Sequence, residues 1–241
     1  MKAILKLFRS WSGCLAAMGL LSIGSSVHAQ VLYLSWDDCT GNFRDKAFDC
    51  STTQGAFELL GSFATSEAIE QIDGFQVHVL VFNASPWWNV APEGCRDRTW
   101  YVSPSTQEPG CVPLEEAISW GTRSTQVGEY THLDVELALS SPHDFVAGEK
   151  RYLFTMTFEN RRADVCSGCC AGACIAFERL DFYRAGEEVA TMYGDFGNGA
   201  VSWQGGVCGV RGGPIVTSAS AGCLATPVST SSWGRIKTIY R

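Results

Sequence analysis

Apolar and polar residues alternate with a period of two along much of this chain. Residues 75–82 place Phe75, Val77, Val79 and Val81 on one face. Because successive side chains of a β-strand point to opposite faces, this pattern predicts strands with one buried face. Residues 133–139 and 151–160 alternate in the same way, and further strands are predicted at 31–36, 56–65, 100–103, 174–184, 189–193 and 200–204.

Glycine and proline separate these runs, and very little of the chain has the period of a helix. Only residues 113–120 and the last nine residues have a briefly helical pattern. We therefore expect an all-β fold, an antiparallel β-sandwich of Ig-like or jelly-roll type with about eight to nine strands.

The first 29 residues have the layout of a secretory signal peptide. Lys2, Lys6 and Arg9 precede an apolar stretch that is too short to span a bilayer, and cleavage is expected after Ala29. The sequence thus predicts a signal peptide at 1–29, a single sandwich domain at 30–225, and a linker with a basic tail at 226–241. Since no later stretch is apolar enough to cross a membrane, we expect a soluble protein that is secreted, periplasmic or extracellular.

The charge of the chain argues against a nucleic-acid partner. The predicted signal peptide carries three basic residues and no acid, so its removal changes the formal net charge from −7 to −10. A domain this acidic repels phosphate backbones, and no basic cluster with interleaved aromatic residues offsets the repulsion. The partner expected instead is a carbohydrate or a protein ligand at a cell surface.

Ten of the 11 cysteines follow the predicted signal peptide, and an even number in an exported chain indicates disulfides. Proximity in the sequence favours three local bridges, Cys39–Cys50, Cys95–Cys111 and Cys208–Cys223. The other four form a tight cluster, in which Cys169 and Cys170 are expected to bond outward to Cys166 and Cys174, because adjacent cysteines bond to each other only with strain. A zinc or iron–sulfur site is the alternative for this cluster, and the export signal favours disulfides over it.

Two loops carry the hard oxygen ligands that calcium prefers. Asp37, Asp38 and Asn42 follow the first predicted strand, and Asp195 and Asn198 lie in a glycine-rich turn. The simpler interpretation is that these residues are ordinary turn formers. Structural calcium is thus the one candidate cofactor, and no other is expected.

Two adjacent tryptophans, Trp87 and Trp88, lie in a predicted loop after a strong strand. On a loop they could form a flat platform for a sugar ring or for a protein partner. The alternative is that they close one open end of the sandwich as core residues. The tryptophans within or beside strands are predicted to be core residues as well, namely Trp36, Trp100, Trp120 and Trp203.

The chain contains no motif of the common hydrolases, metalloproteases or phosphate-binding enzymes. His78 lies mid-strand among apolar residues, where we expect a hydrogen-bonded structural histidine rather than a general base. The paired carboxylates Asp134 and Glu136, or Glu187 and Glu188, could act on a glycoside. Solvated charge beside or on a strand is the simpler interpretation, so no catalytic residue and no enzyme are predicted.

Four segments carry a resemblance to known proteins: 34–39 (LSWDDC), 86–88 (PWW), the cysteine-rich turn before 175–180 (IAFERL), and 233–241 (WGRIKTIYR). In these segments the chain resembles a family of secreted bacterial proteins with a cysteine-rich β-sandwich and no established activity. The resemblance covers nearly the whole chain after the signal peptide, and it implies no catalytic residue. The strand pattern is also similar, at fold level only, to cohesin-like and carbohydrate-binding sandwiches.

Together these patterns predict a secreted, disulfide-braced binding or surface-interaction module without catalytic activity. An exported hydrolase acting on a polysaccharide is the first alternative. A structural component of an envelope or extracellular assembly is the second.

Overall fold

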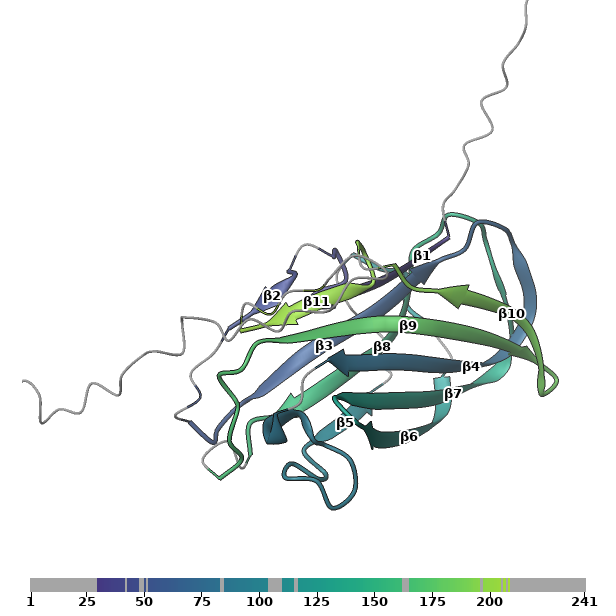
Figure 1. Cartoon of the computed structure of the whole chain (residues 1–241). Helices are drawn as coiled ribbons and strands as arrows, with labels where there is room; N and C mark the ends of the chain where they lie inside the picture. Colours follow the sequence, from purple (N-terminus) through teal and green to yellow (C-terminus); the bar gives the residue numbers. More distant parts are fainter. Residues whose placement is uncertain are drawn as a thin grey trace, which may run out of the picture.

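The computed structural model describes residues 30–208, apart from 42, 48–49, 51, 83–84, 104–109, 115–116, 162–164, 196, 205 and 207. The predicted signal peptide and the predicted tail at 226–241 lie outside the described residues. Within them the predicted fold class is confirmed: two β-sheets pack face to face, and nearly all strand pairs are antiparallel (Figure 1).

The smaller sheet has the strand order β1-β3-β8-β5. Its strands are β1 (Val31–Trp36), β3 (Ala56–Ala64), β8 (Arg151–Glu159) and β5 (Trp100–Ser103). The larger sheet has the order β2-β11-β9-β4-β7-β6, with β10 paired to β9. Its strands are β2 (Asp45–Lys46), β11 (Ala200–Trp203), β9 (Ala173–Arg184), β4 (Ile69–Phe82), β7 (Tyr130–Phe145), β6 (Ala117–Val127) and β10 (Glu187–Tyr193).

The described residues form eleven strands, which is more than the eight or nine expected. The short β2 pairs in parallel with β11 and has no sequence pattern of its own. The helix that the pattern over 113–120 indicated does not form at the C-terminal end of that segment, because residues 117–120 begin β6. β6 joins β7 through a tight turn at Gly128, whose φ of +59° suits glycine, and the long antiparallel hairpin overrides the weak local preference.

The core lies between the sheets and is rich in aromatic rings. At one end Phe63, Phe75, Phe145 and Phe182 pack with ring centroids 5.4–6.3 Å apart. Gly61 in β3 makes room for the Phe154 ring, because a Cβ atom at position 61 would lie 2.2 Å from that ring. This close approach brings β3 and β8 together without a void.

Eight of the described cysteines form disulfides, but the predicted pairing was wrong, including the expected bonds of Cys169 and Cys170 to Cys166 and Cys174. The bridges are Cys39–Cys111, Cys50–Cys169, Cys95–Cys166 and Cys174–Cys208. Local pairs such as Cys39–Cys50 do not form. Cysteines that are close in the sequence lie in different parts of the fold, where each meets a distant cysteine. Cys208 bonds to Cys174 and not to the predicted partner Cys223, which lies outside the described residues.

The segment 166–174 leads into β9, whose second residue is Cys174, and three of its cysteines each bond to a different part of the chain. Cys169 reaches Cys50 before β3, Cys166 reaches Cys95 before β5, and Cys174 reaches Cys208 after β11. These bonds exclude a metal centre built on the four sulfurs. The four bridges join residues 34 to 119 positions apart, and each contributes roughly 4–5 kcal/mol in the chain-entropy account, more than the local bridges would.

Among the described residues, no helix is long and apolar enough to cross a membrane.

Candidate functional site

Trp87 and Trp88 are completely buried and do not form an exposed platform. They lie on the 3₁₀ turn η1 (Pro86–Trp88), which carries both rings into the end of the sandwich. There they pack on Trp203, with ring centroids 4.9 and 5.1 Å away. The prediction of an exposed platform is therefore wrong. The two rings close the end of the sandwich as core residues, which was the alternative. The rings bury too much apolar surface to be left exposed when a core is within reach.

The two candidate calcium loops lie beside each other, and their carboxylates contact protein donors. The Asp38 carboxylate accepts hydrogen bonds from Thr40 N at 3.0 Å and from Ser35 Oγ at 3.1 Å. Asp37 forms an ion pair with Lys46. Asp195 Oδ1 accepts a hydrogen bond from Asn198 N, three residues along the chain, at 2.6 Å.

Arg44 joins these loops by donating from Nη1 to the backbone oxygens of Asn198 and Ala200. Burial lowers the pKa of Arg44, and Asp195 opposes that shift. No group of three or more His, Cys, Asp or Glu side chains in the described part of the chain is arranged to hold a metal. Asn42 lies outside the described residues, and calcium binding stays a prediction.

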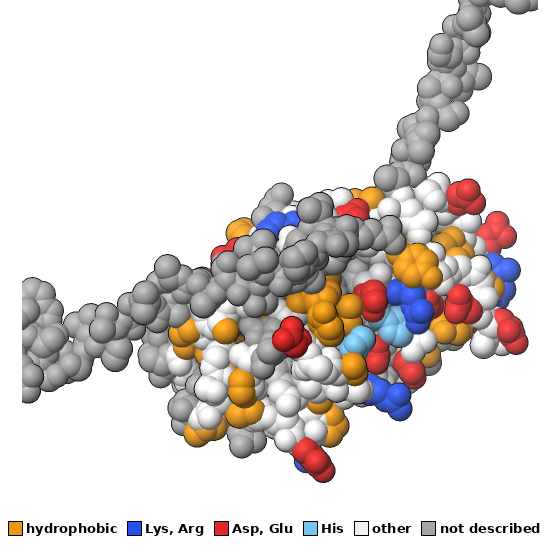
Figure 2. All heavy atoms as spheres, in the orientation of Figure 1, with side chains coloured by type: hydrophobic (Ala, Val, Ile, Leu, Met, Phe, Trp, Pro, Cys, Tyr) orange, Lys and Arg blue, Asp and Glu red, His pale blue; other side chains and the backbone are white. Residues whose placement is uncertain are grey.

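The larger sheet has a polar outer face, which is the face turned away from the smaller sheet. It carries Gln76 and His78 of β4, Asp134 and Glu136 of β7, and Arg179, Asp181 and Tyr183 of β9. The register brings them into rows, with Gln76 between Glu136 and Asp181, and His78 between Asp134 and Arg179. Figure 2 shows histidine, acidic and basic side chains side by side in the middle of this face, with hydrophobic side chains next to them.

His78 is held at both ring nitrogens. Nδ1 lies 2.8 Å from Asp134 Oδ1, and Nε2 lies 2.8 Å from Arg179 Nη2. A guanidinium only donates hydrogen bonds, so Nε2 accepts and the ring proton is on Nδ1, donated to Asp134. Arg179 Nε also pairs with the buried Asp181, at 2.9 Å. We call His78, Asp134, Arg179 and Asp181 the ionic network. It links β7, β4 and β9, and His78 is hydrogen-bonded within it as expected of a structural histidine.

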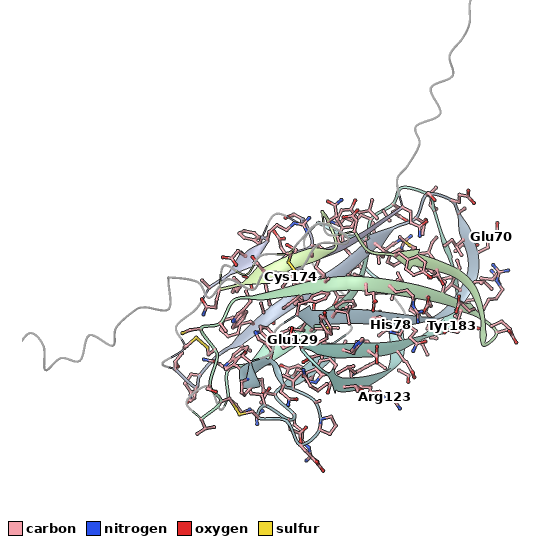
Figure 3. All side chains as sticks on the ribbon, viewed as in Figure 1. Glu70, His78, Arg123, Glu129, Cys174 and Tyr183 are labelled. Carbon is pink, nitrogen blue, oxygen red and sulfur yellow. A yellow bond between two sulfur atoms is a disulfide. The ribbon has the colours of Figure 1, made fainter. Side chains whose placement is uncertain are left out.

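Beside the ionic network, the outer face is hollowed. A cavity of about 790 Å³, here called the outer-face cavity, is lined by Gly74, Gln76, Trp120, Gly121, Glu136 and Tyr183 among others. A smaller cavity of about 250 Å³ adjoins it and shares Gln76, Gly121 and Glu136. Figure 3 shows Tyr183, His78 and Arg123 on this face, contributed by β9, β4 and β6. Gly74 of β4 and Gly121 of β6, on the two strands that flank β7, leave the hollow open.

Tyr183 and Gln76 are fixed to each other in this cavity. The Tyr183 hydroxyl donates to Gln76 Oε1 at 3.0 Å. Burial raises the pKa of Tyr183, and Asp181 and Glu188 raise it further, so the phenol keeps the proton that it donates. Because Oε1 is the acceptor, the two N–H groups of the Gln76 amide remain for another partner.

The sequence located only part of this site. Asp134 and Glu136 were predicted on a solvent-facing side, and they lie there. The sequence analysis did not predict Tyr183 or Gln76 as site residues. Gln76 lies on the polar face of a strand whose apolar face, with Phe75 and Val77, was recognised. Trp120 was predicted to be core and is 49% exposed, because β6 is the last strand of its sheet.

No family model and no curated protein matches the chain. Among solved structures, the chain is similar to a cohesin module from a family 33 glycoside hydrolase of Clostridium perfringens ATCC13124, with a TM-score of 0.35 and 8% identity over 73% of this chain and 98% of that chain. The loose likeness to cohesin-like sandwiches suggested by the strand pattern is thus found. At this TM-score it carries no argument about ligand or activity.

Proposed function

We propose that this protein is an exported, non-catalytic binding module whose ligand occupies the outer face of the larger sheet. The observation that carries the proposal is the outer-face cavity, where the Tyr183 ring, two glycines and polar side chains meet on one sheet. Binding sites of this kind are concave, with a few convergent polar groups. The signal-peptide pattern and the four disulfides support export, since such bridges persist in oxidising compartments.

The same geometry favours binding over hydrolysis. A glycosidase needs one carboxyl group as an acid and another as a base or nucleophile across the scissile bond. Asp134 is engaged by His78, and the Nε2 atom of His78 already accepts from Arg179. The other carboxylate that lines the outer-face cavity with Glu136 is Asp73, and it is engaged as well, because its Oδ2 accepts a hydrogen bond from the Ala185 backbone N–H.

The test uses a variant that fills the cavity. In Gly121→Trp a large ring replaces a residue whose added Cβ would meet no atom closer than 3.8 Å, so the strand is expected to tolerate it. Tyr101→Trp on β5 is the control, because Tyr101 is 48% exposed on the opposite sheet. Labelled protein from residue 30 onward is applied to a glycan array and to a peptide array.

We expect a ligand that wild type and Tyr101→Trp bind and Gly121→Trp does not. The proposal is wrong if no array yields a ligand, or if Gly121→Trp binds like wild type. Release of reducing ends from a bound polymer would replace it with the hydrolase alternative.

A further inference from the structure

We infer that the outer-face cavity binds a neutral carbohydrate through vicinal hydroxyl groups, with a sugar ring seated against Tyr183. This inference rests on the proposed function and adds the chemical class of the ligand. It depends on three features of the cavity: a donor–acceptor pair on its floor, an aromatic wall beside a glycine, and its charge.

The donor–acceptor pair consists of Gln76 and Glu136, which are direct partners across β4 and β7. Gln76 Oε1 accepts from Tyr183, and both N–H groups of this amide remain as donors. Among the described residues, no hydrogen bond or ion pair engages the Glu136 carboxylate, which presents acceptors only. Two neighbouring hydroxyl groups satisfy such a pair at once, since one accepts from the amide and the other donates to the carboxylate.

The wall and the floor of the cavity suit the flat face of a pyranose ring. Tyr183 stands beside Gly74, where an added Cβ atom would lie 3.7 Å from Tyr183 Cβ. On the opposite side, the cross-strand partner of Glu136 is Gly121, so no side chain of β6 stands next to Glu136 at this position. Without Cβ atoms at 74 and 121, a ring can approach the sheet while it packs its C–H face on the phenol.

The charge of the cavity selects a neutral sugar over an acidic one. Asp73 and Glu136 line the outer-face cavity, and Arg123 is the positively charged residue that lines the smaller, adjoining cavity. Asp134, which also lines the smaller hollow, is already paired with His78. A uronic acid or a sulfated sugar would place a further negative charge beside two carboxylates, which disfavours binding.

The experiment compares neutral polysaccharides that differ in their hydroxyl pattern, using calorimetry with the chain from residue 30 onward. The probes with vicinal hydroxyls are soluble β-1,4-linked mannan, xylan and gluco-oligosaccharides. The control is a β-1,3-glucan, whose internal residues have no vicinal hydroxyls. A second control is the mannan after periodate oxidation and borohydride reduction, which destroys vicinal diols but keeps the polymer.

We expect binding to at least one β-1,4-linked probe, and binding at least about tenfold weaker to the β-1,3-glucan and to the oxidised mannan. Tyr183→Ala, Gln76→Leu and Glu136→Gln should each weaken binding by about tenfold or more. Tyr101→Ala and Glu129→Gln should leave it unchanged, since Tyr101 lies on the other sheet and Glu129 in the exposed β6–β7 turn. Melting curves verify that each variant is folded.

Equal binding to the oxidised mannan or to β-1,3-glucan, or full binding by Tyr183→Ala, overturns the carbohydrate inference. So does a complete lack of binding to the β-1,4-linked probes. If Gly121→Trp at the same time abolishes binding of a peptide found on the array, the binding module stands and only its ligand class is wrong. If neither array contains a ligand, the proposed function itself fails.

Discussion

At the scale of single residues, Arg96 shows how a charge is accommodated inside the sandwich. Its guanidinium lies 3.5 Å from the centre of the buried Trp87 ring and donates to the backbone oxygens of Trp87 and Glu159. Burial lowers the pKa of Arg96 to about 9, and Glu159 opposes the shift. The planar cation thus stacks on an aromatic face while its edge donates hydrogen bonds, an arrangement that an ammonium group does not reproduce.

Arg96→Lys is therefore expected to lower the free energy of unfolding by about 2 kcal/mol, because it loses the stacking and leaves a buried carbonyl oxygen without a donor. Urea unfolding followed by tryptophan fluorescence measures the change. Arg98→Lys is the matched control, two residues away with a side chain 92% exposed, and should change stability by less than about 0.5 kcal/mol. Equal stability of Arg96→Lys and wild type would contradict this account.

A second residue-scale prediction concerns acid. Gln71 has a left-handed φ of 59°, and its backbone N–H donates to Asp144 Oδ1 at 2.8 Å. This hydrogen bond lowers the pKa of Asp144 below its ordinary 3.8, with the Gln71 side chain adding to the effect. Because the folded pKa is depressed, the contact stabilises the protein above the unfolded pKa, and that contribution is lost as pH falls through the folded value.

Asp144→Asn should consequently melt at a lower temperature than wild type at pH 7, and the two melting temperatures should converge towards about pH 2. Differential scanning calorimetry across this range makes the comparison. Glu129→Gln, in an exposed turn, serves as the control and should follow the wild-type curve. A gap between Asp144→Asn and wild type that stays constant with pH would refute the linkage.

At the scale of the elements, the strands recognised from the sequence are those with a regular period of two. The 75–82 pattern revealed the second half of β4, but β4 begins at Ile69 with bulges before Gly74, which shift the period and hide its first half. β6 is a polar strand at the edge of its sheet, and its sequence does not alternate between apolar and polar residues, so the sequence analysis did not predict it as a strand. The Gln76–Glu136 pair required the register between β4 and β7, and the Tyr183 contact required β9, about one hundred residues away. Periodicity places side chains on a face, whereas strand order decides which of them meet.

The ionic network gives the element-scale prediction. His78→Leu breaks the hydrogen bonds to Asp134 and Arg179 and should lower the free energy of unfolding by about 2 kcal/mol. A double-mutant cycle with Asp134→Ala should give a coupling energy of about 1 kcal/mol, because the two residues share one hydrogen bond. His132→Leu on β7 is the control partner. Additive effects of the His78 and Asp134 substitutions would mean that the network does not join these strands.

At the scale of the whole molecule, two disulfides of nearly equal span test how the bridges stabilise the fold. Cys39–Cys111 and Cys95–Cys166 have sequence separations of 72 and 71. If restriction of the unfolded chain dominates, replacing either pair by serine should lower stability by a similar amount, about 4 kcal/mol. Guanidinium unfolding of the two double-serine variants measures both. Losses that differ by more than about 2 kcal/mol would show that native packing around the sulfurs decides instead.

The bridges at 166–174 also determine what happens when a protease cuts the chain. Every peptide bond between Cys39 and Cys169, and every one between Cys174 and Cys208, lies inside a loop closed by one of the four described disulfides. A single cut there leaves the two fragments covalently joined, so the nicked molecule keeps its parts, and gel electrophoresis reveals the cut only after reduction. The strands that carry the outer face of the larger sheet would therefore stay tethered to one another after a single cut in either loop.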